Sequence, residues 1–185
     1  MEKRLHWGCG PITPYGWVNS DILPLPGVDV AADILQGLPF PANEFDVIVS
    51  IHVLPEIPYR QLDTALQELL RILKPGGTLR LSLPDLDKAI RAYLDRDVDY
   101  FFLIPDEQVE CLSGKMITQL LWFGQSRCMF TAEFARELLA RNGFASISPC
   151  AFRETKSPHR GITDLDDREL ESLFIEAVKP MADSR

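Results

Sequence analysis

The sequence predicts an α/β fold in which helices cover a mostly parallel sheet. Short apolar segments alternate with turn-forming residues through the first half of the chain, and one long amphipathic helix lies among them. The segment FDVIVS, residues 45–50, is continuously apolar after Asp46, which is typical of a central parallel strand that is buried on both faces. Near the end of the chain, a long polar connector at residues 153–169 separates two apolar segments, which predicts an antiparallel pair ending the sheet.

The expected strands are short apolar segments that are bounded by turn residues. They cover residues 4–7, 17–21, 28–31, 45–50, 78–83, 144–152 and 172–178. The first two are separated only by residues 8–16, fewer than the usual dozen or so of a parallel crossover. We therefore expect an irregular loop or a single turn between them, in place of a helix.

The clearest expected helix covers residues 59–73, where apolar side chains from Leu62 to Leu73 recur at helical spacing. It should end at the Lys-Pro-Gly-Gly segment of residues 74–77, because proline and glycine turn the chain there. Three further helices are expected, at residues 86–94, 106–123 and 131–142. Thr131 is expected to be the N-cap of the last one.

The composition indicates one domain over residues 1–185 and argues against several classes of function. With 46% hydrophobic and 25% charged residues the chain is typical of globular proteins, and no apolar run approaches the roughly 20 residues of a membrane span. No hydrophobic signal region follows the first residues, so we expect a cytoplasmic protein. A net charge of −8 disfavours nucleic acid and favours a small-molecule substrate. The four cysteines form no CxxC pair, so no metal site is expected.

A glycine turn without a helix stands near the start of the chain, in LHWGCGPITPYGWVNSD, residues 5–21. The apolar strand runs into Gly8-Cys9-Gly10, and Pro11, Pro14 and Gly16 then exclude an ordinary helix. A dinucleotide would need a helix amino terminus for its pyrophosphate, so a nicotinamide dehydrogenase is disfavoured.

The order of the parts resembles the class I S-adenosylmethionine-dependent methyltransferases. The parts are the glycine turn, Asp21 ending the second strand, the segments ADI and LPF, FDVIVS, the amphipathic helix and LKPGG before a strand. The pattern is most similar to short members written LxxGCG…GWxNxD, which often accompany polysaccharide biosynthesis. This resemblance implies a three-layer Rossmann-like sheet, mostly parallel with one antiparallel strand, whose first crossover helix is shortened or absent. It also implies methyl transfer from S-adenosylmethionine to a small molecule, with a sugar or glycan precursor as the candidate acceptor and S-adenosylhomocysteine as the product.

The resemblance also assigns residues to the cofactor. They are Gly8, Cys9, Gly10, Asp21, Asp33, Ile34, Leu35, Ser50, Ile51 and His52. The glycine turn would lie against the methionine portion, and Asp21 would accept hydrogen bonds from both ribose hydroxyls because a carboxylate is acceptor-only. Asp33 would meet the adenine amino group with Ile34 and Leu35 beside the ring, and residues 50–52 would lie near the transferable methyl. The glycines also fit a simple tight turn, and Asp33 fits a capping residue.

Asp85 and His52 are the candidate catalytic bases, because both follow strands at the expected cofactor edge of the sheet. Methyl transfer is an in-line displacement, so positioning supplies much of the catalysis and a base matters chiefly for a hydroxyl acceptor. Each candidate has an alternative role. Asp85 also fits the N-cap of the helix that begins at Leu86, and His52 fits a packing residue.

The chain departs from the relatives' pattern at His6, at Pro11 and at Pro55-Glu56, where short relatives often have Glu-His. The irregular glycine loop and the Pro55-Glu56 departure keep a non-catalytic or partner-activating protein as an alternative function. The basic cluster of Arg153, Lys156, His159 and Arg160 suits either an anionic substrate or a solvated surface. The apolar residues 117–123, with Tyr93, Tyr100 and Phe101 upstream, suit a lid over an aromatic acceptor, a core segment or a homodimer contact.

Overall fold

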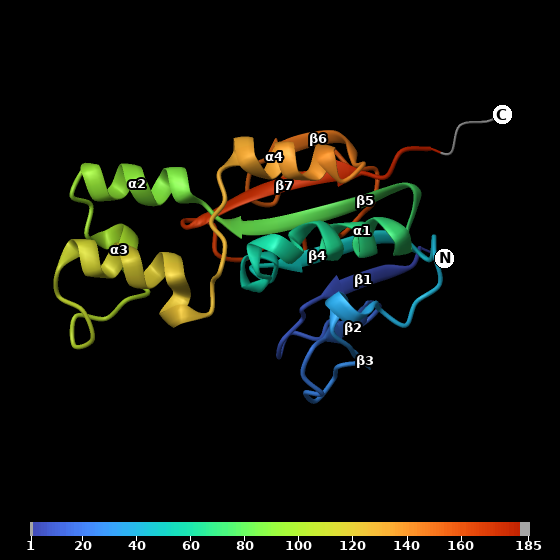
Figure 1. The fold of residues 1–185 in the computed structure, drawn as a ribbon, viewed down its shortest axis with the longest axis horizontal. Helices are drawn as coiled ribbons and strands as arrows, with labels where there is room; N and C mark the ends of the chain where they lie inside the picture. Colours follow the sequence, from blue (N-terminus) through green and yellow to red (C-terminus); the bar gives the residue numbers. More distant parts are fainter. Residues whose placement is uncertain (1, 182–185) are drawn as a thin grey trace.

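The computed structural model describes residues 2–181, which form a seven-stranded sheet flanked by helices (Figure 1). The strands are β1 (Arg4–Trp7), β2 (Val18–Asp21), β3 (Val30–Ala31), β4 (Phe45–Ile51), β5 (Leu73–Pro84), β6 (Ala145–Cys150) and β7 (Ser172–Val178). They lie in the order β3-β2-β1-β4-β5-β7-β6. Strand β7 is antiparallel to both of its neighbours, and the other pairs are parallel. The mostly parallel sheet with one antiparallel strand is therefore confirmed, as is the antiparallel pair that ends it.

Two helices cover one face of the sheet. They are α1 (Leu62–Ile72) and α4 (Ala132–Arg141), which lie side by side in Figure 1. The apolar stripe of α1 packs into the main core with the strands, as its spacing predicts, and only Leu70 in it is partly buried. Helix α4 begins at the expected N-cap, where the Thr131 hydroxyl accepts a hydrogen bond from the Phe134 N–H at 3.1 Å.

The opposite face of the sheet is covered by irregular chain. Here Trp17, Val47 and Val49 pack against Ile162, which belongs to the connector between β6 and β7. Residues 8–17 contain no helix, which confirms the expectation for the first crossover. This short crossover cannot cover the face by itself, so the connector completes the layer.

Helices α2 (Leu86–Leu94) and α3 (Leu112–Leu121) form a separate lobe beyond the end of β5 (Figure 1). Ala89, Ala92 and Phe101 are buried together inside this lobe. Because β4 and β5 are parallel, the carboxyl ends of both strands lie at the sheet edge that faces the lobe. Open α/β sheets bind ligands at this edge.

Several predicted boundaries were wrong. Residues 106–111 form turns and bends instead of the first part of a helix, because these exposed side chains have little apolar surface to bury against the lobe. Strand β5 begins at Leu73, earlier than residue 78, because Leu73 already pairs with Phe45. Strand β3 has only two residues, and the helix predicted from residue 59 begins at Leu62 after a 3-10 turn. No helix among residues 2–181 combines the length and apolar character needed to cross a membrane.

Candidate active site

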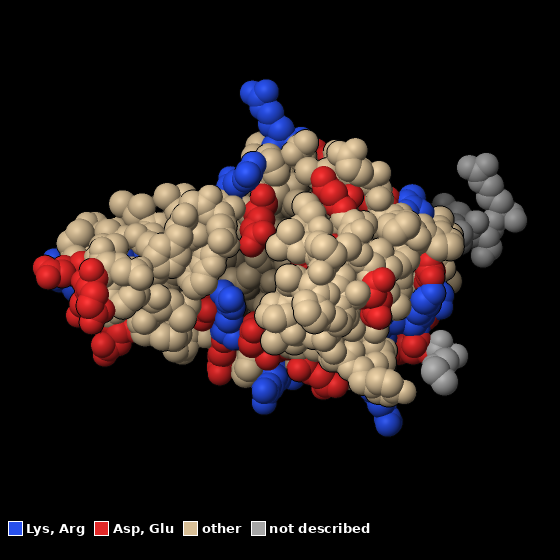
Figure 2. All heavy atoms as spheres, turned by 90° about the horizontal axis from the view of Figure 1, so that it is seen from below, with Lys and Arg blue, Asp and Glu red and all other residues tan. Residues whose placement is uncertain are grey.

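A cavity of about 490 Å³ lies between the sheet edge and the α2–α3 lobe. Figure 2 shows a hollow between the lobe and the body of the molecule, with acidic and basic side chains around it. The lining comes from the ends of β1, β2, β4 and β5, from the lobe, and from the chain that leads into β7. Segments that are far apart in the sequence therefore meet at one site.

Most of the residues predicted for the site line this cavity. These are Gly8, Gly10, Asp21, Asp33, Ile34, Leu35, Ile51, His52 and Asp85. Cys9 and Ser50 lie outside the lining, with 3% and 1% of their surfaces exposed. The Cys9 thiol is directed instead toward the Gly10 carbonyl at 3.6 Å.

The glycine turn is a tight connection that leaves β1. The N–H groups of Gly8 and Cys9 both donate to the Ser20 carbonyl, at 2.7 and 3.0 Å, which ties the turn to β2. Gly8 has a φ of +69°, and a Cβ there would lie only 2.1 Å from Cγ2 of Val53. Glycine is thus required for both the backbone conformation and the close contact. Gly10 also has a positive φ, but no atom lies within 4 Å of a Cβ placed on it.

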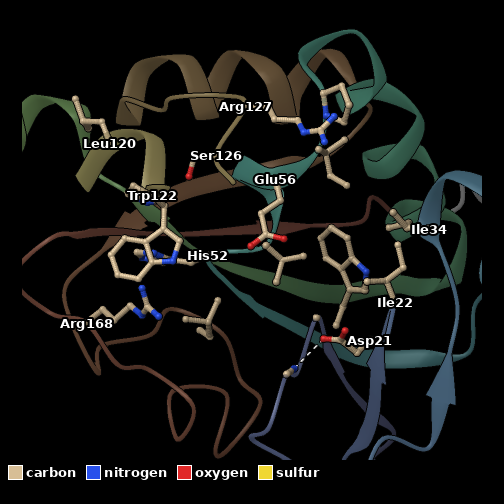
Figure 3. A pocket seen from close by; sticks show the side chains of 18 of the residues that line it. Asp21, Ile22, Ile34, His52, Glu56, Leu120, Trp122, Ser126, Arg127 and Arg168 are labelled. Carbon is tan, nitrogen blue, oxygen red and sulfur yellow. Dashed lines mark hydrogen bonds between the residues drawn. The ribbon is translucent and has the colours of Figure 1, made fainter. Parts of the chain in front are cut away.

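Asp21 ends β2 and fixes the same turn with its carboxylate. Oδ2 accepts a hydrogen bond from the Gly10 N–H at 2.8 Å (Figure 3), and Oδ1 accepts one from the Leu23 N–H at 3.0 Å. An ionised carboxylate has about four acceptor sites, so capacity is left for a ligand's hydroxyl groups. Asp21 therefore both shapes the turn and presents acceptors to the cavity.

Asp33 is the N-cap of the 3-10 helix Ile34–Gln36. Its Oδ1 accepts a hydrogen bond from the Leu35 N–H at 2.9 Å, so the capping alternative describes an observed contact. Ile34 is 4% exposed and lines the cavity beside Asp33. The short helix thus presents one carboxylate and an apolar edge to the same space.

His52 follows β4 with a left-handed backbone, at a φ of 56°. Its Nε2 lies 2.7 Å from the Ser172 hydroxyl oxygen, which gives the ring a fixed partner on β7. Burial, and to a smaller degree the charge of Arg168, lowers the pKa of His52 to about 3. The ring is therefore neutral at pH 7 and is a weak proton acceptor.

Asp85 caps α2, as the alternative role for this residue predicts. Its Oδ1 accepts hydrogen bonds from the Asp87 and Lys88 N–H groups, at 3.0 and 3.2 Å. The residue also lines the cavity. Capping therefore explains the conformation of Asp85, and it places a carboxylate at the site.

Several lining residues were not predicted from the sequence. They are Glu56, Gln119, Arg127, Arg168 and Glu171. Tyr100 and Trp122 also line the cavity, and both belong to the aromatic residues that the sequence offered as a lid. Figure 3 shows the Glu56 carboxylate pointing into the middle of the cavity, between Asp21 and the Trp122 ring. Burial, with a contribution from the Asp21 charge, raises the pKa of Glu56. The only sequence signal for Glu56 was that Pro55-Glu56 stands where short relatives often have Glu-His.

The basic cluster of residues 153–160 lies away from the cavity, since none of its four basic side chains is in the lining. His159 Nδ1 lies 2.7 Å from a carboxylate oxygen of Glu2, on the side of the sheet where β1 begins. The apolar residues 117–123 do not form a uniformly buried core segment. Leu120 lines the cavity, whereas Ile117 and Phe123 are more than half exposed.

Comparison with known proteins identifies the fold. Residues 19–81 match the family model described as a methyltransferase domain. A crystal structure from Thermotoga maritima, described as a possible histamine N-methyltransferase, has a TM-score of 0.61 at 16% identity and covers 97% of this chain and 83% of that one. The chain has a class I methyltransferase fold. A phosphoethanolamine N-methyltransferase from Haemonchus contortus, solved with S-adenosylhomocysteine, gives a TM-score of 0.53 at 14% identity and covers 97% of this chain and 49% of that one.

Curated relatives match about half of the chain. The ubiquinone/menaquinone biosynthesis C-methyltransferase UbiE of Pseudomonas aeruginosa is 36% identical over 86 residues. This match covers 45% of the present chain and only 29% of that relative, so the chain spans less than a third of the relative's length. The family match and the fold support methyl transfer with S-adenosylmethionine as the cofactor.

Proposed function

We propose that this chain transfers a methyl group from S-adenosylmethionine to a small-molecule acceptor. One observation carries the proposal: a single cavity at the carboxyl ends of the strands is lined by the glycine turn, by Asp21 and by the segment that begins at Asp33. This arrangement offers close backbone approach, ribose acceptors and an apolar adenine surface. S-adenosylmethionine has no phosphate, so its site needs no helix amino terminus after β1, and none is present there.

The residues of the cofactor half fit the parts of that molecule. Asp21 accepts the ribose hydroxyls, and the backbone at Gly8 and Gly10 lies against the methionine portion. Ile34 packs on the adenine ring, and Asp33 accepts its amino group. The walls of this half are completed by Leu35, Ile51 and His52. Cys9 and Ser50 lie behind the lining, where they support the glycine turn and strand β4.

The chain's own residues position the acceptor and remove its proton. S-adenosylmethionine supplies a methyl group on a positively charged sulfur and leaves as S-adenosylhomocysteine. The lobe and the chain before β7 hold the acceptor in line with that methyl. Among the candidate bases, Asp85 and Glu56 are carboxylates in the lining, whereas the low pKa of His52 makes it a weak proton acceptor.

A sugar or glycan precursor is one acceptor class, on the ground of the resemblance to short family members. The basic cluster that would attract a sugar nucleotide is not at the cavity, which removes one argument for an anionic member of that class. The names of the similar proteins cover both carbon and nitrogen acceptors. The chemical class of the acceptor therefore has to be inferred from the residues that line the part of the cavity next to the α2–α3 lobe.

Calorimetric titration with S-adenosylmethionine and S-adenosylhomocysteine tests the proposal. We expect both to bind, and we expect Asp21→Asn to weaken binding at least tenfold. Asp29→Asn is the matched control, because Asp29 Oδ2 accepts the Asn19 N–H at 2.8 Å but lies outside the lining. No binding of either compound to the unaltered protein would sink the proposal. Binding without a gain of one methyl in any compound of a metabolite pool would favour the non-catalytic alternative.

A further inference from the structure

The acceptor half of the cavity combines aromatic surface with acidic groups. Tyr100 and Trp122 supply the aromatic rings, and three carboxylates share the lining: Glu56, Asp85 and Glu171. These groups come from the turn after β4, from the α2–α3 lobe and from the chain before β7. Such a set can enclose an apolar ligand body and offer acceptors to one polar end.

The buried Glu171 carboxylate lines this half of the cavity. Only 5% of its surface is exposed, and its carboxylate makes no hydrogen bond to another residue and no ion pair within residues 2–181. Burial raises the pKa of this group. Its own backbone N–H donates to this carboxylate, which leaves acceptor sites that face the cavity and can receive a ligand's donors.

Arg168 and Lys88 lie near enough to Glu171 for their charges to favour its ionised form, but their closest contacts are with other groups. The Arg168 guanidinium lies over the Trp122 ring. Lys88 Nζ donates to the backbone carbonyls of Ser172 and Glu169, at 2.7 and 3.1 Å. Arg127 also lines the cavity, and within the described part of the chain neither arginine forms an ion pair with Glu171 or Glu56.

Gln119 is a second buried polar group in the same lining. Its surface is 7% exposed, and its Oε1 has no hydrogen-bond partner among the described residues. Two buried side chains with unused acceptors therefore share the acceptor half. Their chemistry favours a ligand that is rich in donors over one that is anionic.

We propose that the methyl acceptor is an amine on an aromatic or apolar body, whose ammonium group is held by Glu171 and Glu56. The inference rests on the proposed function. Trp122 and Tyr100 pack on the body of the amine, and the unpaired carboxylates receive its N–H donors. A cation satisfies these carboxylates better than a neutral hydroxyl, because hydrogen bonds between charged groups are roughly twice as strong.

The reaction balances with one proton released. The ammonium passes a proton to a lining carboxylate, for which Glu56 is placed in the middle of the cavity (Figure 3). The freed nitrogen lone pair forms the bond to the methyl carbon as the carbon–sulfur bond breaks, and that electron pair stays on sulfur. The products are the N-methylammonium ion and S-adenosylhomocysteine, and the carboxylate returns its proton to solvent.

Three probes that carry a cationic, a neutral or an anionic end on a phenyl ring with a short alkyl chain test this inference by calorimetry at pH 7. They are phenethylamine, 2-phenylethanol and phenylacetate, each titrated with and without S-adenosylhomocysteine. We expect phenethylamine to bind at least tenfold more tightly than the alcohol and phenylacetate to bind most weakly. Glu171→Gln should remove the tenfold preference and leave alcohol binding unchanged. Glu169→Gln is the control, because Glu169 is exposed and lies outside the lining.

Each other outcome overturns the inference in a distinguishable way. Equal binding of the three probes, or preferred binding of phenylacetate, would contradict it while S-adenosylhomocysteine binding upheld the proposed function. Preferred binding of methyl glucoside with the same dependence on Glu171 would indicate a sugar acceptor instead. If S-adenosylhomocysteine does not bind, the proposed function fails, and the probe series without it still measures the preference for the amine. Glu56→Gln provides a second variant should Glu171→Gln alter the fold.

Discussion

The Arg168 guanidinium lies over the indole ring of Trp122, 5.2 Å from the ring centroid (Figure 3). Both residues have a left-handed backbone, with φ values of 55° and 44°. Such conformations are uncommon for residues other than glycine and cluster at functional sites. The contact joins the α2–α3 lobe to the chain before β7, so it links the two walls of the acceptor half.

We predict that Trp122→Leu weakens phenethylamine binding at least fivefold and leaves the affinity for S-adenosylhomocysteine within twofold. The substitution removes the ring on which both the amine body and Arg168 pack, but it does not touch the glycine turn. Phe123→Leu is the matched control, because Phe123 has the same backbone conformation and lies outside the lining. Calorimetry on the three proteins decides the matter. Equal losses of phenethylamine affinity in both variants would mean that the backbone geometry of residues 122–123, and not the Trp122 ring, is important.

The two glycines of the turn should respond differently to alanine. Gly8→Ala meets Val53 and a positive φ, so we expect a loss of about 2–4 kcal/mol in the free energy of unfolding. Gly10→Ala meets no atom within 4 Å, so only the backbone cost of about 1 kcal/mol should appear. Gly10 lines the cavity. Despite the small loss of stability, we therefore expect Gly10→Ala to lower the affinity for S-adenosylhomocysteine at least tenfold. Urea unfolding and calorimetry measure both effects. Stability losses of the same size at the two positions would contradict the role assigned to Val53.

The sequence predicted much of the fold because the decisive signals are local. The apolar segments and the Thr131 cap each act within a few residues, and the structure confirms them. The Lys-Pro-Gly-Gly segment was predicted as a turn but lies inside β5, because strand pairing already begins at Leu73. The prediction was wrong for residues 106–111, which were joined to the apolar segment that follows them although their own exposed side chains have little apolar surface to bury. Helix propensity alone rarely sustains such a short segment.

The site was predicted only where it follows the strand ends. Asp21, Asp33 and Asp85 stand at these ends, so the order of strands places them together. Glu56 and Glu171 reach the same cavity from positions more than a hundred residues apart. No local pattern encodes their meeting, because it depends on β7 lying beside β5 and on how the connector packs.

The neutral state of His52 gives a testable dependence of stability on pH. Its pKa is about 3 in the folded protein and about 6.5 when unfolded, so below pH 6.5 the unfolded state binds the extra proton and stability falls. Between pH 7 and pH 5 this contributes a loss of roughly 1–2 kcal/mol. The raised pKa values of Glu56 and Glu171 act in the opposite direction.

A comparison with His52→Asn isolates that contribution, since asparagine tolerates the left-handed backbone at this position. Urea unfolding of both proteins at pH 7 and pH 5 should show a smaller loss in the variant, by roughly 1–2 kcal/mol. Other titrating groups are common to both proteins and cancel in the difference. Identical losses would show that His52 is accessible to protons in the folded state.

A buried ion network fixes the connector that carries the acceptor wall. Arg80 Nε donates to Asp166 at 2.7 Å and Arg80 Nη1 donates to Glu176 at 2.6 Å, and all three side chains are almost fully buried. Asp166 lies two residues before Arg168, so the network determines where the chain enters the cavity. Strand β5 thereby supports a wall that no regular element builds.

We expect Arg80→Met to lower the free energy of unfolding by about 3–5 kcal/mol, because two buried carboxylates lose their cation. The triple variant Arg80→Met, Asp166→Asn, Glu176→Gln should recover part of this loss, since no unpaired charge remains. Both variants should bind phenethylamine less tightly, because the segment that carries Arg168 and Glu171 loses its anchor. The glycine turn and Asp21 are on the other side of the cavity, so S-adenosylhomocysteine affinity should stay within twofold. Urea unfolding and calorimetry measure these quantities, and equal weakening of both ligands would show that the network supports the whole sheet and not one wall.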